Sequence, residues 1–261
     1  MTVHTLSRCL AAALLLVAAE VQAAEVRVMI SAGFFGVYKE LGPAFERATG
    51  HKLVTTRGPS MGDSPEAIPT RLARGEPADV VIMDGHGADE LVKRGDARAD
   101  GKVMLAGSMV GMVVREGAPK PDIGTVEAFK KVLLDAKSIA YSDSGSGTYL
   151  STKLFKQLGV ADEIAPKSRK VRGPPSGEPV AHVVARGEAE IGFQQVSELI
   201  NVPGAAFVGP LPAELQPGFS FAGAVTANAK EPEAAMALLR FLSSAEAAPV
   251  ITRLGLAPIA R

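Results

Sequence analysis

Short apolar runs alternate with amphipathic segments along most of this chain, and this alternation constrains its fold more than any other feature. Val26–Ile30 has the pattern of a buried strand, and Phe35–Thr49 follows it as an amphipathic helix that ends at Gly50. Repetition of this pattern predicts an α/β fold with mostly parallel sheets. The other expected strands are Lys52–Thr56, Ala78–Met83, Gly107–Arg115, Ser138–Tyr141, Lys170–Arg172, Ile191–Gln195 and Phe219–Ala227. The other expected helices are Ala67–Gly75, Ala88–Arg94, Thr125–Leu134, Tyr149–Leu158, Pro179–Gly187, Glu231–Leu242 and Ala245–Leu254.

Two of these strands are long and bracket the middle third of the chain. If Gly107–Arg115 and Phe219–Ala227 are crossovers, residues 107–218 form a second lobe inserted into a first lobe made of 24–106 and 219–261. A ligand cleft would then lie between the lobes, where loops at the carboxyl ends of strands converge. The alternative is a single doubly wound domain with one long sheet.

The N-terminal residues have the pattern of an export signal. Arg8 is followed by the apolar stretch Cys9–Ala19, which is too short to span a bilayer, and Val21–Ala23 is a small-x-small cleavage site. We therefore expect residues 1–23 to be a signal peptide and the protein to lie in the periplasm. Cys9 is the one cysteine, so the exported chain would have no disulfide and no cysteine ligand.

The charge balance argues against nucleic acid as a partner, and the histidine spacing argues against a metal site. Lys plus Arg and Asp plus Glu both number 28, so the chain has no basic excess for nucleic acid. His51, His86 and His182 share no metal-ligand spacing, and His51 follows a helix-ending glycine where we expect it to be solvated. We expect a monomer with no metal and no cofactor.

Two Ser/Gly-rich loops each precede an expected helix. They are Ile30–Gly36 and Ser142–Thr148, over a hundred residues apart. A helix N-terminus leaves backbone N–H groups unpaired and carries partial positive charge, and serine adds hydroxyl donors. If the loops come from two lobes and face each other, they would hold a small anion.

Several phrases resemble the periplasmic molybdate-binding family of the type II solute-binding proteins. The phrases are Val28–Phe34, Ala73–Ile82, Gly107–Val110, Phe155–Gly159 and Ala185–Gly192. The resemblance covers nearly all of the chain beyond the signal, and Gly192–Leu199 and Val208–Pro212 are typical of a divergent branch. It implies a two-lobed α/β fold that holds a small anion between the lobes, and a membrane permease of the ABC type as a possible partner.

The resemblance also implies positions for the ligand, and here the chain departs from the family. The first-loop serine of the family falls at Gly33 or Ser31, and its second cluster falls near Ser60 and Ser64, here preceded by Arg57. Its backbone donors in the second lobe fall near Gly147 and Gly177, and its pocket tyrosine falls at about Gln195. Gln194 and Gln195 should point to opposite faces of a strand, with Gln195 the one in the cleft.

Arg57 and Arg172 suggest a ligand other than an oxyanion. A guanidinium matches a carboxylate in bidentate fashion, although both residues could be ordinary surface arginines. Likewise, Ser144, Ser146 and Thr148 could be plain helix caps. The expected ligand-binding residues are Ser31, Gly33, Arg57, Ser60, Ser144, Ser146, Gly147, Thr148, Arg172, Gly177 and Gln195.

Three functions remain open. The first is a receptor that binds a di- or tricarboxylate such as aconitate and delivers it to a permease. The second, which the resemblance also allows, is an isomerase that moves a proton along such a tricarboxylate, and the third is an oxyanion-binding protein. An isomerase needs a base with a tuned pKa. The candidates are His86, His182, Glu178, Asp143 and Tyr149, and the sequence does not choose among them.

Overall fold

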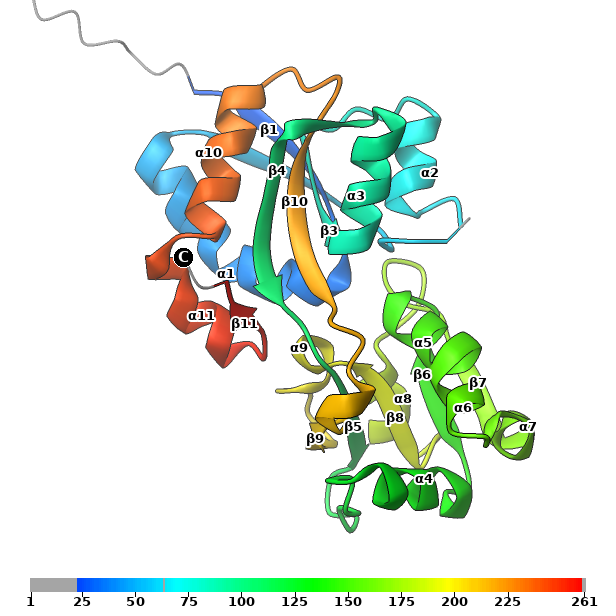
Figure 1. Ribbon diagram of the computed structural model, residues 1–261. Helices are drawn as coiled ribbons and strands as arrows, with labels where there is room; N and C mark the ends of the chain where they lie inside the picture. Colours follow the sequence, from blue (N-terminus) through cyan, green and yellow to red (C-terminus); the bar gives the residue numbers. More distant parts are fainter. Residues whose placement is uncertain (1–22, 63, 260–261) are drawn as a thin grey trace, which may run out of the picture.

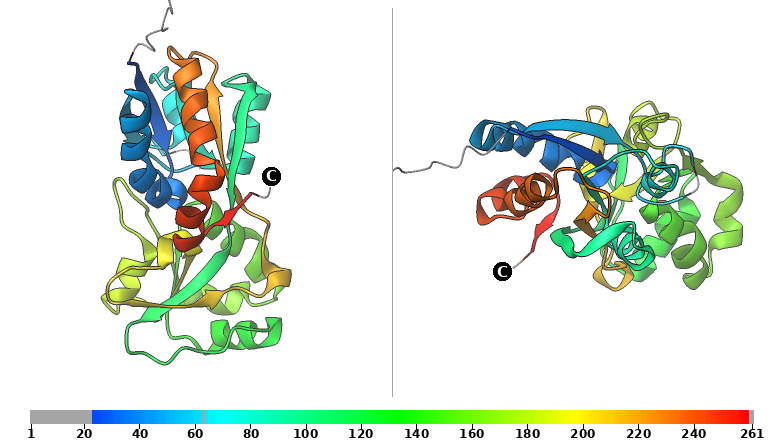
Figure 2. Two further views of the ribbon diagram at one scale, coloured as in Figure 1. Left: turned by 90° about the vertical axis from the view of Figure 1, so that its left-hand side faces the viewer. Right: turned by 90° about the horizontal axis from the view of Figure 1, so that it is seen from above.

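The computed structural model describes residues 23–62 and 64–259, so the expected signal peptide lies almost entirely outside the described residues. Two mixed sheets, each covered by its own helices, lie end to end as two lobes (Figures 1 and 2). The predicted two-lobed α/β fold is therefore confirmed. The first lobe is the six-stranded sheet with its helices, and the second lobe is the five-stranded sheet with its helices.

The first lobe contains both ends of the described chain. Its strands are β1 (Glu25–Ile30), β2 (Lys52–Arg57), β3 (Val80–Asp84), β4 (Ala97–Gly107), β10 (Ser220–Thr226) and β11 (Ala257–Pro258), in the order β11-β4-β10-β3-β1-β2. Its helices are α1 (Ala32–Thr49), α2 (Ile68–Ala73), α3 (Gly85–Arg94), α10 (Pro232–Leu242) and α11 (Ala248–Arg253). Helices α1 and α10 pack on one face of the sheet, while α2 and α3 pack on the other.

The second lobe has the same layered organisation. Its strands are β5 (Val110–Arg115), β6 (Ile139–Ser142), β7 (Ser168–Val171), β8 (Ile191–Gln195) and β9 (Ala205–Pro210), in the order β7-β6-β8-β5-β9. Its helices are α4 (Val126–Asp135), α5 (Gly145–Tyr149), α6 (Phe155–Gln157), α7 (Ala161–Ile164), α8 (Val180–Ala185) and α9 (Val196–Leu199). A buried core with Phe129 packed edge-on against Phe193 joins α4 to β8.

Parallel pairing is less extensive than the alternation predicts. In the first sheet β1 pairs in parallel with β2 and β3, whereas β10 and β4 are antiparallel additions. In the second sheet β6 pairs in parallel with β7 and β8, and β5 and β9 are antiparallel. Apart from β11, which pairs antiparallel with β4 at the edge of the first sheet, the antiparallel strands are those by which the chain passes between the sheets, because β4 leads into β5 and β9 precedes β10.

Several elements differ from the expected ones. The long strand expected at 107–115 is split, since Gly107 ends β4 and Val110 begins β5 in the other sheet. Strand β4 was not expected, because the charged residues Arg98, Asp100 and Lys102 interrupt the apolar pattern of its first half, and β9 was not expected either. The helix expected at 149–158 begins at Gly145 and includes a π-helical turn over Leu150–Leu154.

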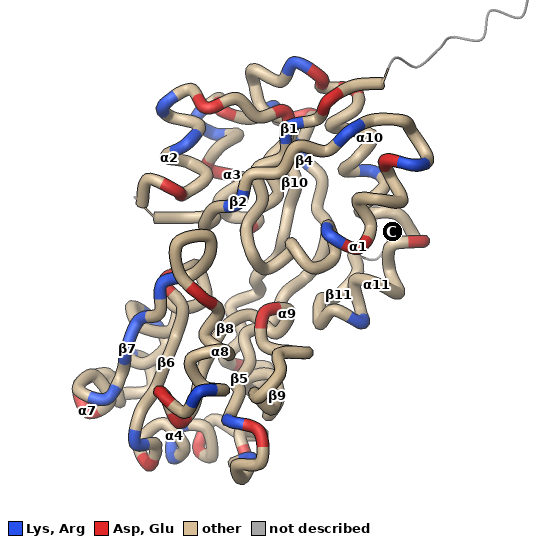
Figure 3. Tube along the Cα trace, turned by 180° about the vertical axis from the view of Figure 1, so that it is seen from behind, with Lys and Arg blue, Asp and Glu red and all other residues tan. Residues whose placement is uncertain are grey.

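Charges of both signs are interspersed over the two lobes (Figure 3). Within residues 23–62 and 64–259, no single helix is long and apolar enough to cross a membrane. Helix α10 and the segment from Ala245 to Arg253 together have the length and composition of a membrane-crossing segment, but the chain bends between them.

Candidate functional site

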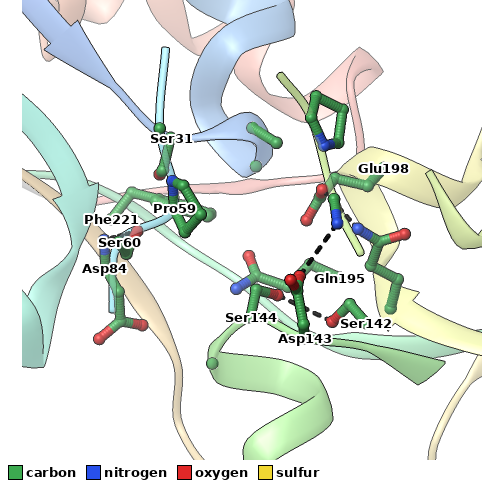
Figure 4. A pocket seen from close by; sticks show the side chains of 17 residues that line it. Ser31, Pro59, Ser60, Asp84, Ser142, Asp143, Ser144, Gln195, Glu198 and Phe221 are labelled. Carbon is green, nitrogen blue, oxygen red and sulfur yellow. Dashed lines mark hydrogen bonds between the residues drawn. The ribbon is translucent and has the colours of Figure 1, made fainter. Parts of the chain in front are cut away.

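A small cavity of about 40 Å3 lies between the two lobes. Figure 4 shows Ser31, Ser60 and Asp84 of the first lobe opposite Asp143, Ser144 and Glu198 of the second. The cavity lies where the carboxyl ends of the parallel strands meet, as expected for α/β sheets. Its lining residues are Ser31, Ala32, Gly33, Gly58, Pro59, Ser60, Asp84, Ser142, Asp143, Ser144, Gly145, Gly173, Pro174, Gln194, Gln195, Glu198 and Phe221. We call it the interlobe cavity.

Both Ser/Gly-rich loops border the interlobe cavity, and both open helices toward it. Ser31 immediately precedes the 18-residue helix α1, and Ser144 precedes the helical segment 145–157. The backbone N–H groups of the first turns have no acceptor within their own helices. The buried hydroxyl of Ser31 also has no hydrogen-bond partner among the described residues. The two helix starts therefore present anion donors from opposite lobes.

The other expected residues of the second loop have mainly structural contacts. The Ser146 hydroxyl is buried and lies 3.0 Å from the Ser142 hydroxyl, which is also 2.8 Å from that of Ser144. A Cβ at Gly147 would come within 1.6 Å of the Ser142 carbonyl oxygen, so this glycine allows close packing of the loop on β6. Thr148 is exposed, and its N–H bonds to Ser144. None of Ser146, Gly147 and Thr148 lines the interlobe cavity.

Glu198 is a lining carboxyl group that the sequence analysis missed. It lies on α9, directly after β8, and its Oε1 accepts a 2.6 Å hydrogen bond from Gln194 Nε2. Burial raises the pKa of Glu198 to about 7, even though Arg57 and the Gln194 hydrogen bond act in the opposite direction and the Asp143 charge adds to the rise. A carboxyl group with such a pKa can exchange a proton near neutral pH.

Asp84 and Asp143 are the other acids on the cavity wall. Asp84 Oδ1 accepts from the backbone N–H groups of His86 and Gly87, while its Oδ2 is buried without a partner among the described residues. Burial raises the pKa of Asp84. Asp143 accepts a 3.0 Å hydrogen bond from the Gly173 N–H, which joins the two loops of the second lobe. Ser60 accepts from the Asp84 N–H and so ties the β2 loop to the end of β3.

The two arginines expected in the site do not line the interlobe cavity. The Arg57 guanidinium lies 4.1 Å from the centre of the Phe35 ring, and its buried Nε has no hydrogen-bond partner among the described residues. Its charge nevertheless acts on Glu198, and burial lowers the pKa of Arg57. Arg172 is exposed, with a nitrogen 3.8 Å from a carboxylate oxygen of Glu66.

Both adjacent glutamines border the cavity, whereas only Gln195 was expected there. Gln195 Oε1 accepts a 2.8 Å hydrogen bond from Ser108, in the connection between β4 and β5. Gln194 bonds instead to Val180 and Glu198. The two side chains thus bond to different partners, yet both residues line the cavity.

Of the candidate bases, only Asp143 lines the interlobe cavity. His86 and His182 are exposed, and Glu178 pairs with Arg186 at 2.7 Å on the surface. The Tyr149 hydroxyl donates to the Leu215 carbonyl, and burial raises the pKa of Tyr149. The expected donor Gly177 packs against Arg172, where a Cβ would lie 2.0 Å from the carbonyl oxygen.

The expectation that His51 is solvated is wrong. The ring is buried against Phe45, and its Nδ1 accepts a 3.1 Å hydrogen bond from the Ala24 N–H. It therefore holds the start of β1 against the turn after α1. Among the described residues, no group of three or more His, Cys, Asp or Glu side chains is arranged to hold a metal ion.

A sequence signal for Glu198 did exist. Gln194 and Glu198 are four residues apart in Gly192–Leu199, a phrase that begins in a buried strand and ends in a helix. Strand ends of this kind converge on ligand clefts. An acid one turn beyond a buried strand is thus a candidate acid–base group that histidine spacing and isolated loop acids do not reveal.

Sequence comparisons assign the chain to a family of ligand-binding proteins. The family model described as "Bacterial extracellular solute-binding protein" matches residues 26–257. An aconitate isomerase from Pseudomonas sp. is 49% identical over 232 residues, which cover 89% of this chain and 87% of that protein. The molybdate-binding protein ModA of Azotobacter vinelandii is 30% identical, with 92% of each chain covered.

Solved structures give the same assignment of the fold. The periplasmic molybdate-binding protein of Azotobacter vinelandii superposes with a TM-score of 0.71 at 21% identity, covering 90% of this chain and all of that one. A sulfate-binding protein from Mycobacterium tuberculosis superposes with a TM-score of 0.68 at 19% identity, covering 90% and 87% of the two chains. The chain therefore belongs to the bacterial extracellular solute-binding proteins and resembles their molybdate-binding, type II periplasmic members.

Proposed function

We propose that this protein isomerises a small tricarboxylate of the aconitate type in the interlobe cavity, with Glu198 as the acid–base group. The observation that carries the proposal is a carboxyl group on the cavity wall whose pKa is raised to about 7. A simple anion receptor has no need of such a group, whereas a proton-transfer enzyme does. The 49% identity to an aconitate isomerase supports the same choice.

The substrate carboxylates would be held by neutral donors. The starts of α1 and of segment 145–157 supply backbone N–H groups from the two lobes, and Ser31 and Ser144 add hydroxyl groups. Arg57, outside the cavity wall, contributes positive charge behind Glu198. Partial charges from helix termini and amides stabilise anions in a water-poor site without bringing a second full charge to the reacting carbon.

The chemistry is an allylic proton shift. Ionised Glu198 takes a proton from the methylene carbon of the substrate, and the C–H electron pair forms a new double bond to the central carbon. The old double bond shifts its electrons to the former vinylic carbon and its attached carboxylate, which gives a dienolate. Glu198, now protonated, returns the proton to that carbon, which completes the shift and regenerates the ionised carboxylate with no net change in atoms or electrons. Donors at the helix starts stabilise the negative charge that develops on the carboxylate.

A receptor that delivers an anion to an ABC-type permease is the second candidate. The match to the solute-binding family over residues 26–257 and the two-lobed cavity favour it. In both cases the expected signal peptide, residues 1–23, would direct the protein to the periplasm.

One experiment separates the two. The purified protein is incubated with cis-aconitate or trans-aconitate, and the isomer ratio is followed by NMR or chromatography. We expect the ratio to approach the same equilibrium from both sides, at a rate proportional to protein concentration. Binding of aconitate without a change in isomer ratio would reject the isomerase and leave the receptor, and stabilisation by molybdate alone would favour an oxyanion-binding protein.

Glu198→Gln tests the assigned group. It removes the titrating carboxyl but keeps the size of the side chain, so turnover should fall by at least about a hundredfold, as is typical for loss of an acid–base group. Thermal stabilisation by aconitate should remain. Glu214→Gln, on an exposed turn of the second lobe, is the matched control and should retain the parental rate.

A further inference from the structure

We propose that Gln194 is a positioning residue that determines which oxygen of Glu198 exchanges the proton. This inference rests on the proposed function, and it assigns a role to a buried amide that the binding of substrate does not require. Gln194 is 2% exposed and lies in β8, one residue before its end. Its side chain bonds to two groups of different chemistry, and this fixes its orientation.

The first group is the backbone N–H of Val180, at the start of α8. It donates a 3.0 Å hydrogen bond to Gln194 Oε1. A backbone N–H can only donate, so the oxygen of the amide must face Val180.

The second group is the carboxyl of Glu198. With the oxygen held by Val180, the amide NH2 faces Glu198 and donates to its Oε1 at 2.6 Å. No hydrogen bond from any other described residue reaches the carboxyl of Glu198. A proton on Oε1 would point at an N–H donor, so the proton resides on Oε2. Because Gln194 occupies Oε1, Oε2 is the oxygen that exchanges the proton with the substrate.

Three neighbouring groups, from three different elements, affect the pKa of Glu198. Arg57, at the end of β2, and the Gln194 amide favour the ionised form, while Asp143, after β6, disfavours it. Burial is the strongest influence and raises the pKa. Loss of the Gln194 donor should therefore raise the pKa of Glu198 further and move the acidic limb of the pH–rate profile to higher pH.

A purely structural role is the competing explanation, because Gln194 also satisfies the Val180 N–H. Two substitutions separate the explanations. Gln194→Met removes both hydrogen bonds, whereas Gln194→Glu keeps an acceptor for Val180 and replaces the donor toward Glu198 with a second carboxyl group. A structural role predicts an unshifted Glu198 titration in Gln194→Met, whereas a positioning role predicts a raised midpoint in this variant. Gln194→Glu raises the midpoint through like charge under either explanation, and it shows whether an acceptor for the Val180 N–H is enough to keep the fold.

The test measures kcat/KM for aconitate between pH 5.5 and 9, together with the titration of the Glu198 carboxyl carbon by 13C NMR, assigned by its absence in Glu198→Gln. We expect the midpoint to rise by about one pH unit or more in both Gln194 variants, which corresponds to a roughly tenfold loss of rate on the acidic side. The rate should recover at high pH. Gln216→Met is the control, since Gln216 also bonds to backbone groups of the second lobe but lies off the interlobe cavity.

An unshifted Glu198 titration in Gln194→Met would overturn the inference and leave Gln194 a structural residue. The NMR titration needs no turnover, so it tests the Gln194–Glu198 coupling even if the parent protein fails to isomerise aconitate. Failure of the parent to turn over would reject the proposed function, whereas parental turnover with an unshifted profile rejects only the role of Gln194.

Discussion

The Ser176 hydroxyl of the second lobe donates a 2.6 Å hydrogen bond to the Glu66 carboxylate of the first lobe. A second bond between the lobes joins the Ser197 hydroxyl to the Gly33 carbonyl at 2.7 Å. Arg172 adds a long ionic contact to Glu66. The described structure therefore has its lobes in direct contact, and a ligand must break contacts of this kind to enter or leave.

The Glu66 contact should slow ligand release. Glu66→Ala removes the acceptor for Ser176 and the charge near Arg172, so dissociation should be faster, and by no more than about fivefold because exposed pairs contribute little. Stopped-flow measurement of the dissociation rate at low and high salt checks this. The exposed Glu163→Ala, in the second lobe, is the control. An unchanged rate would show that the contact opens without cost.

Ser31→Ala should weaken binding without destabilising the fold. Ser31 precedes α1 but makes no side-chain capping bond, and its hydroxyl has no partner among the described residues. We expect a loss of about 0.5–1.5 kcal/mol in anion affinity and a nearly unchanged melting temperature.

Thr125→Ala is the opposite control, because the Thr125 hydroxyl accepts from the Ala128 N–H and caps α4. It should cost about 1 kcal/mol of stability with no effect on binding. Calorimetry and thermal unfolding of both variants check the pair. A large loss of stability in Ser31→Ala would mean that its hydroxyl serves the fold.

Gly147 should be intolerant of any side chain. Even the Cβ of Gly147→Ala would collide with the Ser142 carbonyl, and Gly147→Val is worse. The second lobe should be destabilised while the first lobe stays folded, whereas Ser144→Ala should cost only about 0.5–1.5 kcal/mol of binding. Ser146→Ala, which removes a buried hydrogen bond to Ser142 away from the cavity, should cost a similar amount of stability and leave binding unchanged.

Thermal unfolding and circular dichroism measure these effects. Gly209→Ala, whose Cβ would have no neighbour closer than 4.0 Å, is the matched control in the same lobe. Parental stability and binding in Gly147→Val would show that the loop is an ordinary helix start that tolerates bulk.

Arg57 should act mainly through its charge on Glu198. Arg57→Leu removes a positive charge that favours ionised Glu198, so the pKa of Glu198 should rise and the acidic limb of the pH–rate profile should move upward. Arg57→Lys should restore most of the parental profile.

Calorimetry of Arg57→Ala with aconitate decides whether Arg57 also contacts the ligand. Loss of a direct buried charge pair would cost roughly 2–5 kcal/mol of affinity. An unchanged affinity would limit Arg57 to its electrostatic effect, and an unchanged pH profile in Arg57→Leu would contradict that effect.

Glu198 should make the folded protein less stable at high pH. Its folded-state pKa of about 7 lies above the ordinary value of 4.5, so the cost of ionising it grows as pH rises through this interval and is complete above it. Glu198→Gln should therefore increase the free energy of unfolding at pH 8 by up to about 3 kcal/mol, and should change it little at pH 4.5. Urea unfolding at the two pH values measures the difference. Equal effects at both values would show that burial does not shift the Glu198 pKa.

Local patterns in the sequence determined most of the fold. The apolar periods of β1, α1 and β3 and the Ser/Gly-rich loops before two helices are local signals, and they depend only on burial and backbone geometry. The same signals were weak in β4, where the charged residues Arg98, Asp100 and Lys102 interrupt the apolar pattern, and at residues 107–115, where the chain changes sheets.

Tertiary structure alone decided which of the candidate residues meet. Gln194, Glu198 and Arg57 come together because the β8–α9 junction of the second lobe lies near the end of β2 in the first lobe. No pattern within one segment encodes that approach. The pKa of Glu198 also depends on how far the two lobes bury its carboxyl group, since desolvation is set by everything packed around the group and not by its neighbours in sequence.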